Sequence, residues 1–468
     1  MDTPIYDFVT TYRDSSALRL HMPGHKGMGM LGVEALDITE IEGADVLYHA
    51  DGIIRRSEGN AASLFGTART VYSTEGSSLA IRAMLYLTLL YGKSVGRKPV
   101  IAAGRNAHKT FLTACALLDV EPAWIFPEKR EDLLSCEITA ERLDGFFMSC
   151  GEDEKPLAVY ITSPDYLGHV ADIRGLADVC HRHGALLLVD NAHGAYLNFL
   201  PNTGGRAIDG EDYSLKKLAH PIALGADLCC DSAHKTLPVL TGGAYLHISQ
   251  NAPKLFVERA EQGMSLFAST SPSYLILQSL DLANQYLADG YRERLAEYVK
   301  KVEELKEKLT CAGYVLVGDE PLKLTVDAKA YGYTGDELCD LLAKKDMICE
   351  FADPDYVVMM VTPESGEEAL EKIEAVLRSI ERKPAITERM PAMAKPVRAI
   401  SPREALFSVS RQLDLHECCG KVLATATVSC PPAIPIVVCG EVIDEAAIRV
   451  MEYYGVKSCI VVESGCDC

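Results

Sequence analysis

Lys235 stands in the segment Asp231-Ser232-Ala233-His234-Lys235-Thr236-Leu237, directly after the apolar run Leu228-Cys229-Cys230. The run predicts a buried strand, so the segment is expected to leave its carboxyl end, where open α/β sheets bind ligands. A lysine flanked by a hydroxyl and an imidazole is typical of a Schiff-base nucleophile whose neighbours bind an anion or move a proton. The alternative is an ordinary solvated cation, since the chain has 46 Lys+Arg.

Three other polar motifs stand where an apolar run ends: Gly76-Ser77-Ser78, Asn106-Ala107-His108 and Asp190-Asn191-Ala192-His193. The first opens a helix after a strand, so its backbone N–H groups, two hydroxyls and helix dipole suit a phosphate. Its alternative role is a plain serine N-cap. Asp190, at the end of a buried strand, is expected either to cap a loop or to face a ligand cation.

The four motifs together match the needs of one cofactor. If their strands are parallel, they lie on one sheet edge in the chain order phosphate cradle, imidazole, carboxylate, lysine. Pyridoxal phosphate requires these groups: donors for its phosphate, a flat partner for its ring, a carboxylate that keeps the pyridine nitrogen protonated, and an amine for its aldehyde. The chain has three His-Lys pairs, but only His234-Lys235 follows both a strand and an earlier Asp junction, so Lys235 is predicted to carry the Schiff base.

The elements that position these motifs alternate between strand and helix. Uninterrupted apolar runs between helical patterns predict a mainly parallel sheet covered on both faces, and hence an α/β fold. The expected strands are 70–73, 100–103, 124–126, 157–162, 185–189 and 244–248, and the expected helices are 57–65, from 79, 111–118, 138–149 and 173–183.

Residues 1–55 are expected to form an irregular N-terminal arm, because they are rich in Gly, His and Asp with Pro-Gly and Lys-Gly steps. Residues 56–310 form the predicted major domain, which ends in a helical stretch, 273–309. Residues 311–383 are expected to be a small α+β domain, with strands at 322–326, 347–351 and 356–361 and helices at 335–344 and 367–381. Residues 384–402, with four prolines, are a linker, and 403–468 a C-terminal subdomain.

Composition excludes several classes of function. The formal charge of −20 opposes a nucleic-acid partner and attracts a small cationic substrate. The 16 cysteines lack zinc-site spacing. The opening Met1-Asp2-Thr3-Pro4 predicts no secretion signal, and the longest apolar helix, Leu79 to Tyr91, is too short to span a membrane. We therefore expect a cytoplasmic protein with reduced thiols and no membrane contact.

In its site motifs the chain resembles the ornithine/lysine/arginine decarboxylases, which are fold-type-I pyridoxal-phosphate enzymes. The resemblance is to the short form without an amino-terminal receiver-like domain. Nearly the whole chain is covered by ordered motifs that have counterparts in the family. They are His21 to Gly27, Leu64 to Ser78, Asn106 to Lys109, Asp190 to Gly194, Ser232 to Pro238, Thr270 to Tyr274 and Pro431 to Pro435.

The resemblance implies a role for each motif. Lys235 would form the Schiff base, Asp190 would pair with the pyridinium nitrogen, and His108 would stack on the ring. The expected cofactor-binding residues also include Gly76, Ser77, Ser78, Ala192, His193, Ser232 and His234. Family members are dimers or larger assemblies with the site at the subunit interface, so a homodimer or higher homo-oligomer is expected.

The function that the resemblance implies is α-decarboxylation of lysine, arginine or ornithine to a polyamine-pathway amine and CO₂, with Lys235 or His234 returning a proton to Cα. A buried substrate cation needs a carboxylate, for which Glu441 is the candidate, against the alternative of an exposed loop acid. Asn191 stands where many short members have Glu. Two alternatives stay open: another fold-type-I reaction, such as transamination or acyl transfer, and a cofactor-binding regulatory subunit without activity.

Overall fold

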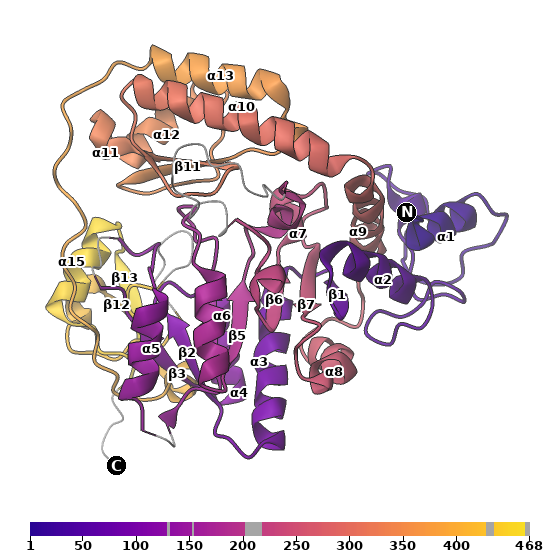
Figure 1. Ribbon diagram of the computed structural model, residues 1–468, viewed down its shortest axis with the longest axis horizontal. Coiled ribbons are helices and arrows are strands. Elements are labelled where there is room, and N and C mark those ends of the chain that lie inside the picture. The colour runs from indigo at the N-terminus through magenta and orange to yellow at the C-terminus, as the bar shows by residue number, and fades with distance from the viewer. Residues whose placement is uncertain (129–131, 152–153, 202–217, 427–434, 464–468) are drawn as a thin grey trace. The chain divides into compact units, whose positions relative to one another are not determined.

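The computed structural model describes residues 1–128, 132–151, 154–201, 218–426 and 435–463 (Figure 1). The chain divides into two compact units, each built from two separate stretches. Unit 1 comprises Met1–Arg97 and Ile173–Ala296, and unit 2 comprises Lys98–Asp172 and Glu297–Cys468. The domain bounds expected from the sequence stay a prediction.

Unit 1 holds a four-stranded sheet in the order β1-β7-β6-β5, formed by Arg69–Ser73, Ala244–Ile248, Leu228–Asp231 and Leu186–Asp190. Strands β5 and β6 pair in parallel, while β7 is antiparallel to both β6 and β1. Because two reversals cancel, β1, β5 and β6 run in the same direction. Their carboxyl ends therefore lie at one edge of the sheet.

The helices of unit 1 follow from apolar faces that pack on this sheet and on each other. Helix α3, for example, packs against α8 (Figure 1). The α-helices are α1 (Pro4–Arg13), α2 (Ile53–Phe65), α3 (Ser77–Ser94), α6 (Ile173–Arg182), α7 (Ala233–Thr236), α8 (Lys254–Ser265) and α9 (Tyr274–Ala288); 3₁₀ turns are η1 (Glu34–Leu36), η3 (Ala195–Phe199) and η4 (Pro221–Leu224). Helix α10 (Tyr291–Cys311) begins in unit 1 and ends in unit 2.

Unit 2 holds a parallel three-stranded group, a four-stranded antiparallel sheet and a two-stranded antiparallel sheet. The parallel strands are β4 (Ala158–Thr162), β2 (Val100–Gly104) and β3 (Glu121–Ile125). The antiparallel order is β10 (Phe351–Ala352), β11 (Tyr356–Met360), β9 (Lys323–Asp327), β8 (Leu316–Val317), and the last pair is β12 (Ser410–Asp414) with β13 (Ser458–Val462).

Helices α4 (Lys109–Leu118), α5 (Ala140–Ser149), α11 (Ala328–Tyr331), α12 (Gly335–Ala343), α13 (Gly366–Ser379), α14 (Pro402–Phe407) and α15 (Glu445–Tyr453), with turns η5 (Pro363–Ser365) and η6 (Leu415–Cys418), complete unit 2. Helices α10 and α13 lie side by side (Figure 1) and are joined by ion pairs of Lys301 with Glu367 and Lys308 with Glu374. Within the described ranges no helix is long and apolar enough to cross a membrane, and all thirteen cysteines there are free thiols.

Some predictions for individual elements are wrong. The N-terminal arm is not irregular throughout, because Pro4–Arg13 is a helix whose Ile5 and Val9 are buried. The stretch 273–309 is two helices, separated at Asp289-Gly290. Helix α8 was not expected, and the strand at 347–351 is reduced to Phe351–Ala352. The strands at the predicted site, in contrast, lie within one residue of their expected bounds.

Candidate functional site

The junction after β1 begins a long helix with a glycine. Gly76 caps α3 with a φ of +71°, a conformation that favours glycine, and no side chain caps this end of the helix. The alternative prediction, that a serine is the N-cap of α3, is therefore wrong. Ser77 and Ser78 occupy the first turn, where backbone N–H groups lack helical acceptors. Ser232, from the junction after β6, donates a hydrogen bond from its Oγ to the Oγ of Ser77 at 2.8 Å.

The junction after β6 carries the lysine. Residues Ala233–Thr236 form one helical turn, α7, so that His234 and Lys235 are half-buried. The Nζ of Lys235 lies 3.0 Å from the Nε2 of His193, which belongs to the junction after β5. The Nδ1 of His234 lies 2.9 Å from the carbonyl oxygen of Gly243. Since a carbonyl only accepts, this nitrogen carries the imidazole proton.

Asp190 ends β5 and is buried, with an exposed fraction of 3%. Its Oδ1 accepts a hydrogen bond from the backbone N–H of Ala192 at 3.2 Å and faces the thiol of Cys230 at 3.6 Å. Burial, followed by the nearby charges of Asp190 and Asp231, raises the pKa of Cys230, so this thiol stays protonated and donates. Asp190 and Cys230 are register partners of the parallel pair β5 and β6. The predicted residues Gly76, Ser77, Asp190, Ala192, His193, Ser232, His234 and Lys235 thus gather in unit 1 at one sheet edge.

His108 belongs to unit 2 and is the N-cap of α4, where its Nδ1 accepts from the backbone N–H of Thr110 at 3.2 Å. Because the accepting nitrogen must be unprotonated, the neutral ring carries its proton on Nε2. The stacking of His108 on a cofactor bound in unit 1 stays a prediction.

Glu441 is not an exposed loop acid. It is buried in unit 2, and its Oε2 accepts from the Nη2 of Arg105 at 2.7 Å and from the backbone N–H of Val438 at 2.9 Å. Burial lowers the pKa of Arg105, and Glu441 opposes that effect. Of the terminal motif, Pro431, Pro432, Ala433 and Ile434 lie outside the described residues.

Sequence reasoning missed two buried polar groups. One is Arg105, whose guanidinium also lies 4.9 Å from the ring centre of Trp124; its signal is a charged residue directly after the apolar run of β2. The other is a set of two histidines, His220 and His247, that contact Asp231. A histidine inside an otherwise apolar strand, as His247 is, is the signal that could have found this set.

The chain is similar to known proteins over most of its length. Residues 3–368 match the family described as Orn/Lys/Arg decarboxylase, major domain. An arginine decarboxylase of Bacillus subtilis is 28% identical over 95% of this chain and 92% of its own length. The uncharacterized protein YaaO of the same organism is 28% identical over 96% and 93%.

A solved structure shares the fold. The lysine decarboxylase LdcF of Francisella novicida superposes with a TM-score of 0.76 and 16% identity, covering 98% of this chain and 81% of its own. This likeness concerns the fold alone and confirms the expected fold-type-I class. The family match spans well over half of the 468 residues, so the chain belongs to the Orn/Lys/Arg decarboxylase family.

Proposed function

We propose that this protein decarboxylates a basic L-amino acid with pyridoxal phosphate as its cofactor. The observation that carries the proposal is the convergence of Lys235, Asp190 and the Ser77–Ser232 pair at one edge of the unit 1 sheet, in a chain of this family. These residues come from the ends of β1, β5 and β6, and together they supply an amine, a carboxylate and two hydroxyls that the cofactor requires.

The residues present fit the cofactor. The hydroxyls of Ser77 and Ser232 stand at the N-terminus of an 18-residue helix, where donors and the helix dipole favour a phosphate. Asp190 offers a buried carboxylate for a ring N–H, and the lysine amine stands one junction away on the neighbouring strand. Family membership supports the assignment independently.

When bound, pyridoxal phosphate supplies an aldehyde for amines and an electron-poor ring that accepts the electron pair left at Cα as CO₂ departs. Asp190 would hold the proton at the pyridine nitrogen and so keep that ring electron-poor. His193 accepts or returns a proton at the Nζ of Lys235, which it contacts. Lys235 or His234 would return the proton to Cα, and His108 would stack on the ring, as the family resemblance implies.

The substrate we propose is arginine, lysine or ornithine. Support comes from family membership, from the relative named arginine decarboxylase and from the formal charge of −20, which attracts cationic amino acids. Glu441 stays a proposed partner for the distal cation of the substrate. Its carboxylate already pairs with Arg105, so Glu441 also has a candidate role in stabilising the fold. Experiment has to separate that role from substrate binding.

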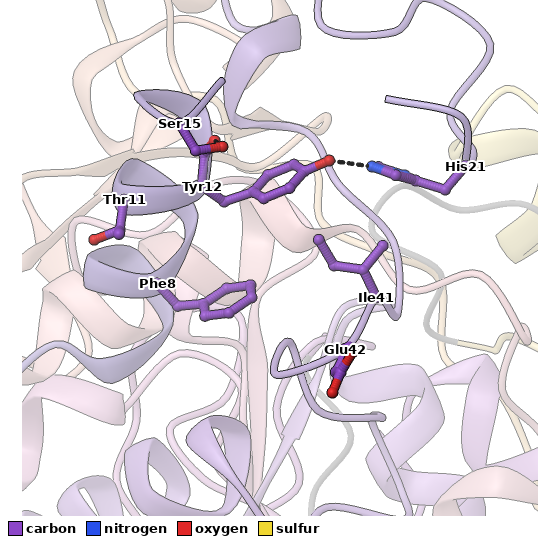
Figure 2. Close-up of a pocket in the computed structure, with 7 residues that line it drawn as sticks. All are labelled: Phe8, Thr11, Tyr12, Ser15, His21, Ile41 and Glu42. Carbon is purple, nitrogen blue, oxygen red and sulfur yellow. Dashed lines mark hydrogen bonds between the residues drawn. The ribbon is translucent and has the colours of Figure 1, made fainter. Parts of the chain in front are cut away.

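We also propose that the protein is a homodimer or higher homo-oligomer. In the N-terminal arm Leu18, Leu20, Met28, Met30 and Leu31 are each at least 80% exposed, and such apolar segments are typical of interfaces. The arm also encloses a cavity of about 430 Å³, lined by residues that include Phe8, Tyr12 and Ile41. Figure 2 shows Tyr12 bonded across it to His21, at 2.6 Å. A second copy of this chain would cover these side chains.

The test is a mass-spectrometric screen of amine products after incubation with arginine, lysine and ornithine, with measurement of CO₂. Agmatine, cadaverine or putrescine in equal yield with CO₂ is expected, and Lys235→Ala should abolish both the product and the visible absorption of the bound cofactor. Lys109→Ala, from another His-Lys pair, is the matched control and should keep the absorption. A keto acid or acyl-transfer product, or cofactor binding with no turnover of any substrate, would contradict the proposal.

A further inference from the structure

A fully buried polar cluster adjoins the junction after β6, which carries Lys235. It consists of His220, at the start of η4, Asp231, at the end of β6, and His247, inside β7. The Oδ2 of Asp231 lies 3.0 Å from the Nε2 of His220 and 3.1 Å from the Nε2 of His247. All three side chains have no solvent exposure. Asp231 immediately precedes Ser232, so the cluster is adjacent to the site without being part of it.

A carboxylate oxygen only accepts, so each ring presents a protonated Nε2 to Asp231. The Nδ1 of His220 accepts from the backbone N–H of Ile222, so its proton is on Nε2 and points at Asp231. The Nδ1 of His247 faces the hydroxyl of Thr70 at 2.9 Å. Burial lowers the pKa of His247 and so keeps it neutral. Burial alone would raise the pKa of Asp231, but the two histidines outweigh it and lower that pKa, so the carboxylate is ionised.

The second oxygen of Asp231 connects the cluster to the junction after β5. Its Oδ1 accepts from the Nδ2 of Asn191 at 2.7 Å. The backbone N–H of Asn191 donates to the carbonyl of Cys230, and its own carbonyl accepts from the N–H of Gly194. A Cβ on Gly194 would lie only 2.0 Å from the Oδ1 of Asn191. The turn that carries Asp190 and His193 is therefore held closely against the end of β6.

We propose that Asp231 is a positioning residue, whose carboxylate, held by His220 and His247, fixes Asn191 and thereby sets Asp190 and His193 relative to Lys235. This proposal rests on the proposed function of the site. Two histidines contact one oxygen, while the other accepts from the amide of Asn191 and, at 3.6 Å, from the thiol of Cys229. Rotation of the carboxylate or of Asn191 would therefore break a buried hydrogen bond to a charged group.

A metal site is the competing explanation, because two imidazole nitrogens and a carboxylate oxygen lie within 4.8 Å of one another. A metal requires an unprotonated nitrogen. The Nε2 of His220 is the protonated nitrogen of its ring, since its Nδ1 accepts from Ile222. Both nitrogen-to-oxygen distances are also those of ordinary charge-assisted hydrogen bonds. The hydrogen-bonded arrangement is therefore favoured.

The experiment is a double-mutant cycle of Asp231→Asn and Asn191→Asp. In Asp231→Asn the new amide oxygen can accept from both histidines only if its NH₂ group turns toward the NH₂ group of Asn191. In Asn191→Asp, two carboxylates face each other. The double variant restores a donor and an acceptor at this contact. Each single variant should raise the Kd for pyridoxal phosphate about tenfold or more, and the double variant should recover to within about threefold of the wild type.

Asp227→Asn is the matched control. Asp227 precedes the opposite end of the same strand, is buried and also pairs with a histidine, His181, at 3.0 Å. The Asp227→Asn variant should lower the free energy of unfolding but change the Kd for pyridoxal phosphate less than about twofold.

Urea unfolding of the cofactor-free variants separates this proposal from the proposed function. If the wild type fails to bind pyridoxal phosphate, the proposed function fails. The coupling between positions 191 and 231 in the free energy of unfolding can still be measured, and it then decides whether Asp231 holds Asn191 in place. Single variants that bind the cofactor as tightly as the wild type, or a double variant no better than either, would overturn the positioning role. Stoichiometric zinc or iron in the purified protein, lost in Asp231→Asn, would overturn it in favour of a metal site.

Discussion

Replacing Glu441 with Gln tests whether this acid serves the fold or the substrate. The side chains of Arg105 and Glu441 are 2% and 4% exposed, and their Nη2 and Oε2 atoms are 2.7 Å apart. Gln preserves the volume and an acceptor for the Val438 N–H, but it leaves the guanidinium without a counter-charge. Removing one partner of a buried ion pair costs about 3–5 kcal/mol. We expect Glu441→Gln to lower the free energy of unfolding by about 3 kcal/mol, because the amide retains part of the hydrogen bonding.

The chain provides its own reporter for this measurement. Its single tryptophan is Trp124, and the guanidinium of Arg105 lies 4.9 Å from the ring centre. Urea unfolding followed by tryptophan fluorescence therefore reports on this unit. The double variant Arg105→Met with Glu441→Leu removes both charges, so it should be more stable than Glu441→Gln alone. A loss below about 1 kcal/mol for Glu441→Gln would refute the structural role. A raised KM for the basic amino acid at unchanged stability would instead support the substrate role.

Three further predictions concern the ring nitrogen, a buried acid and the N-terminal arm. Asp190→Asn should retain the cofactor, seen by its absorption, but slow decarboxylation by about a hundredfold or more; unchanged turnover would contradict the role of Asp190. Burial raises the pKa of Asp353 from 3.8 to about 7, so the folded state keeps a proton that the unfolded chain loses, and stability falls as pH rises through that interval. Asp353→Asn should therefore stabilise the protein above about pH 7 by up to about 4 kcal/mol and have little effect near pH 4; urea unfolding at several pH values that gives parallel curves for both proteins would refute this. Met30→Asp with Leu31→Asp should dissociate the oligomer in analytical ultracentrifugation, while the exposed control Val95→Asp should not; a monomeric wild type would contradict the proposed assembly.

Local sequence was sufficient for the parts of the fold that carry the site. The apolar runs that form β5 and β6 end in Asp190 and Asp231 as expected. The strand-to-helix alternation also predicted the α/β class, which the decarboxylase structures share. The junctions were predictable because buried strands require apolar side chains and polar ones stand where the strands end.

Features that depend on distant partners were not predictable in this way. Helix α1 was missed because the carboxylate of Asp281, far along the chain, accepts from the first-turn N–H groups of Ile5 and Tyr6. The strand β7 was predicted, but its antiparallel direction was not, because a single apolar run has no signal for direction. The pairing of Glu441 with Arg105, 336 positions apart, is of the same kind.

The most direct test of the central claim is to reduce the purified protein, incubated with pyridoxal phosphate, with borohydride and to locate the modified lysine by peptide mass spectrometry. The pyridoxyl group is predicted on Lys235, with incubation in arginine, lysine or ornithine before reduction lowering the yield of that peptide. Modification of Lys26 or Lys109, the lysines of the other His-Lys pairs, with none on Lys235, would contradict the account.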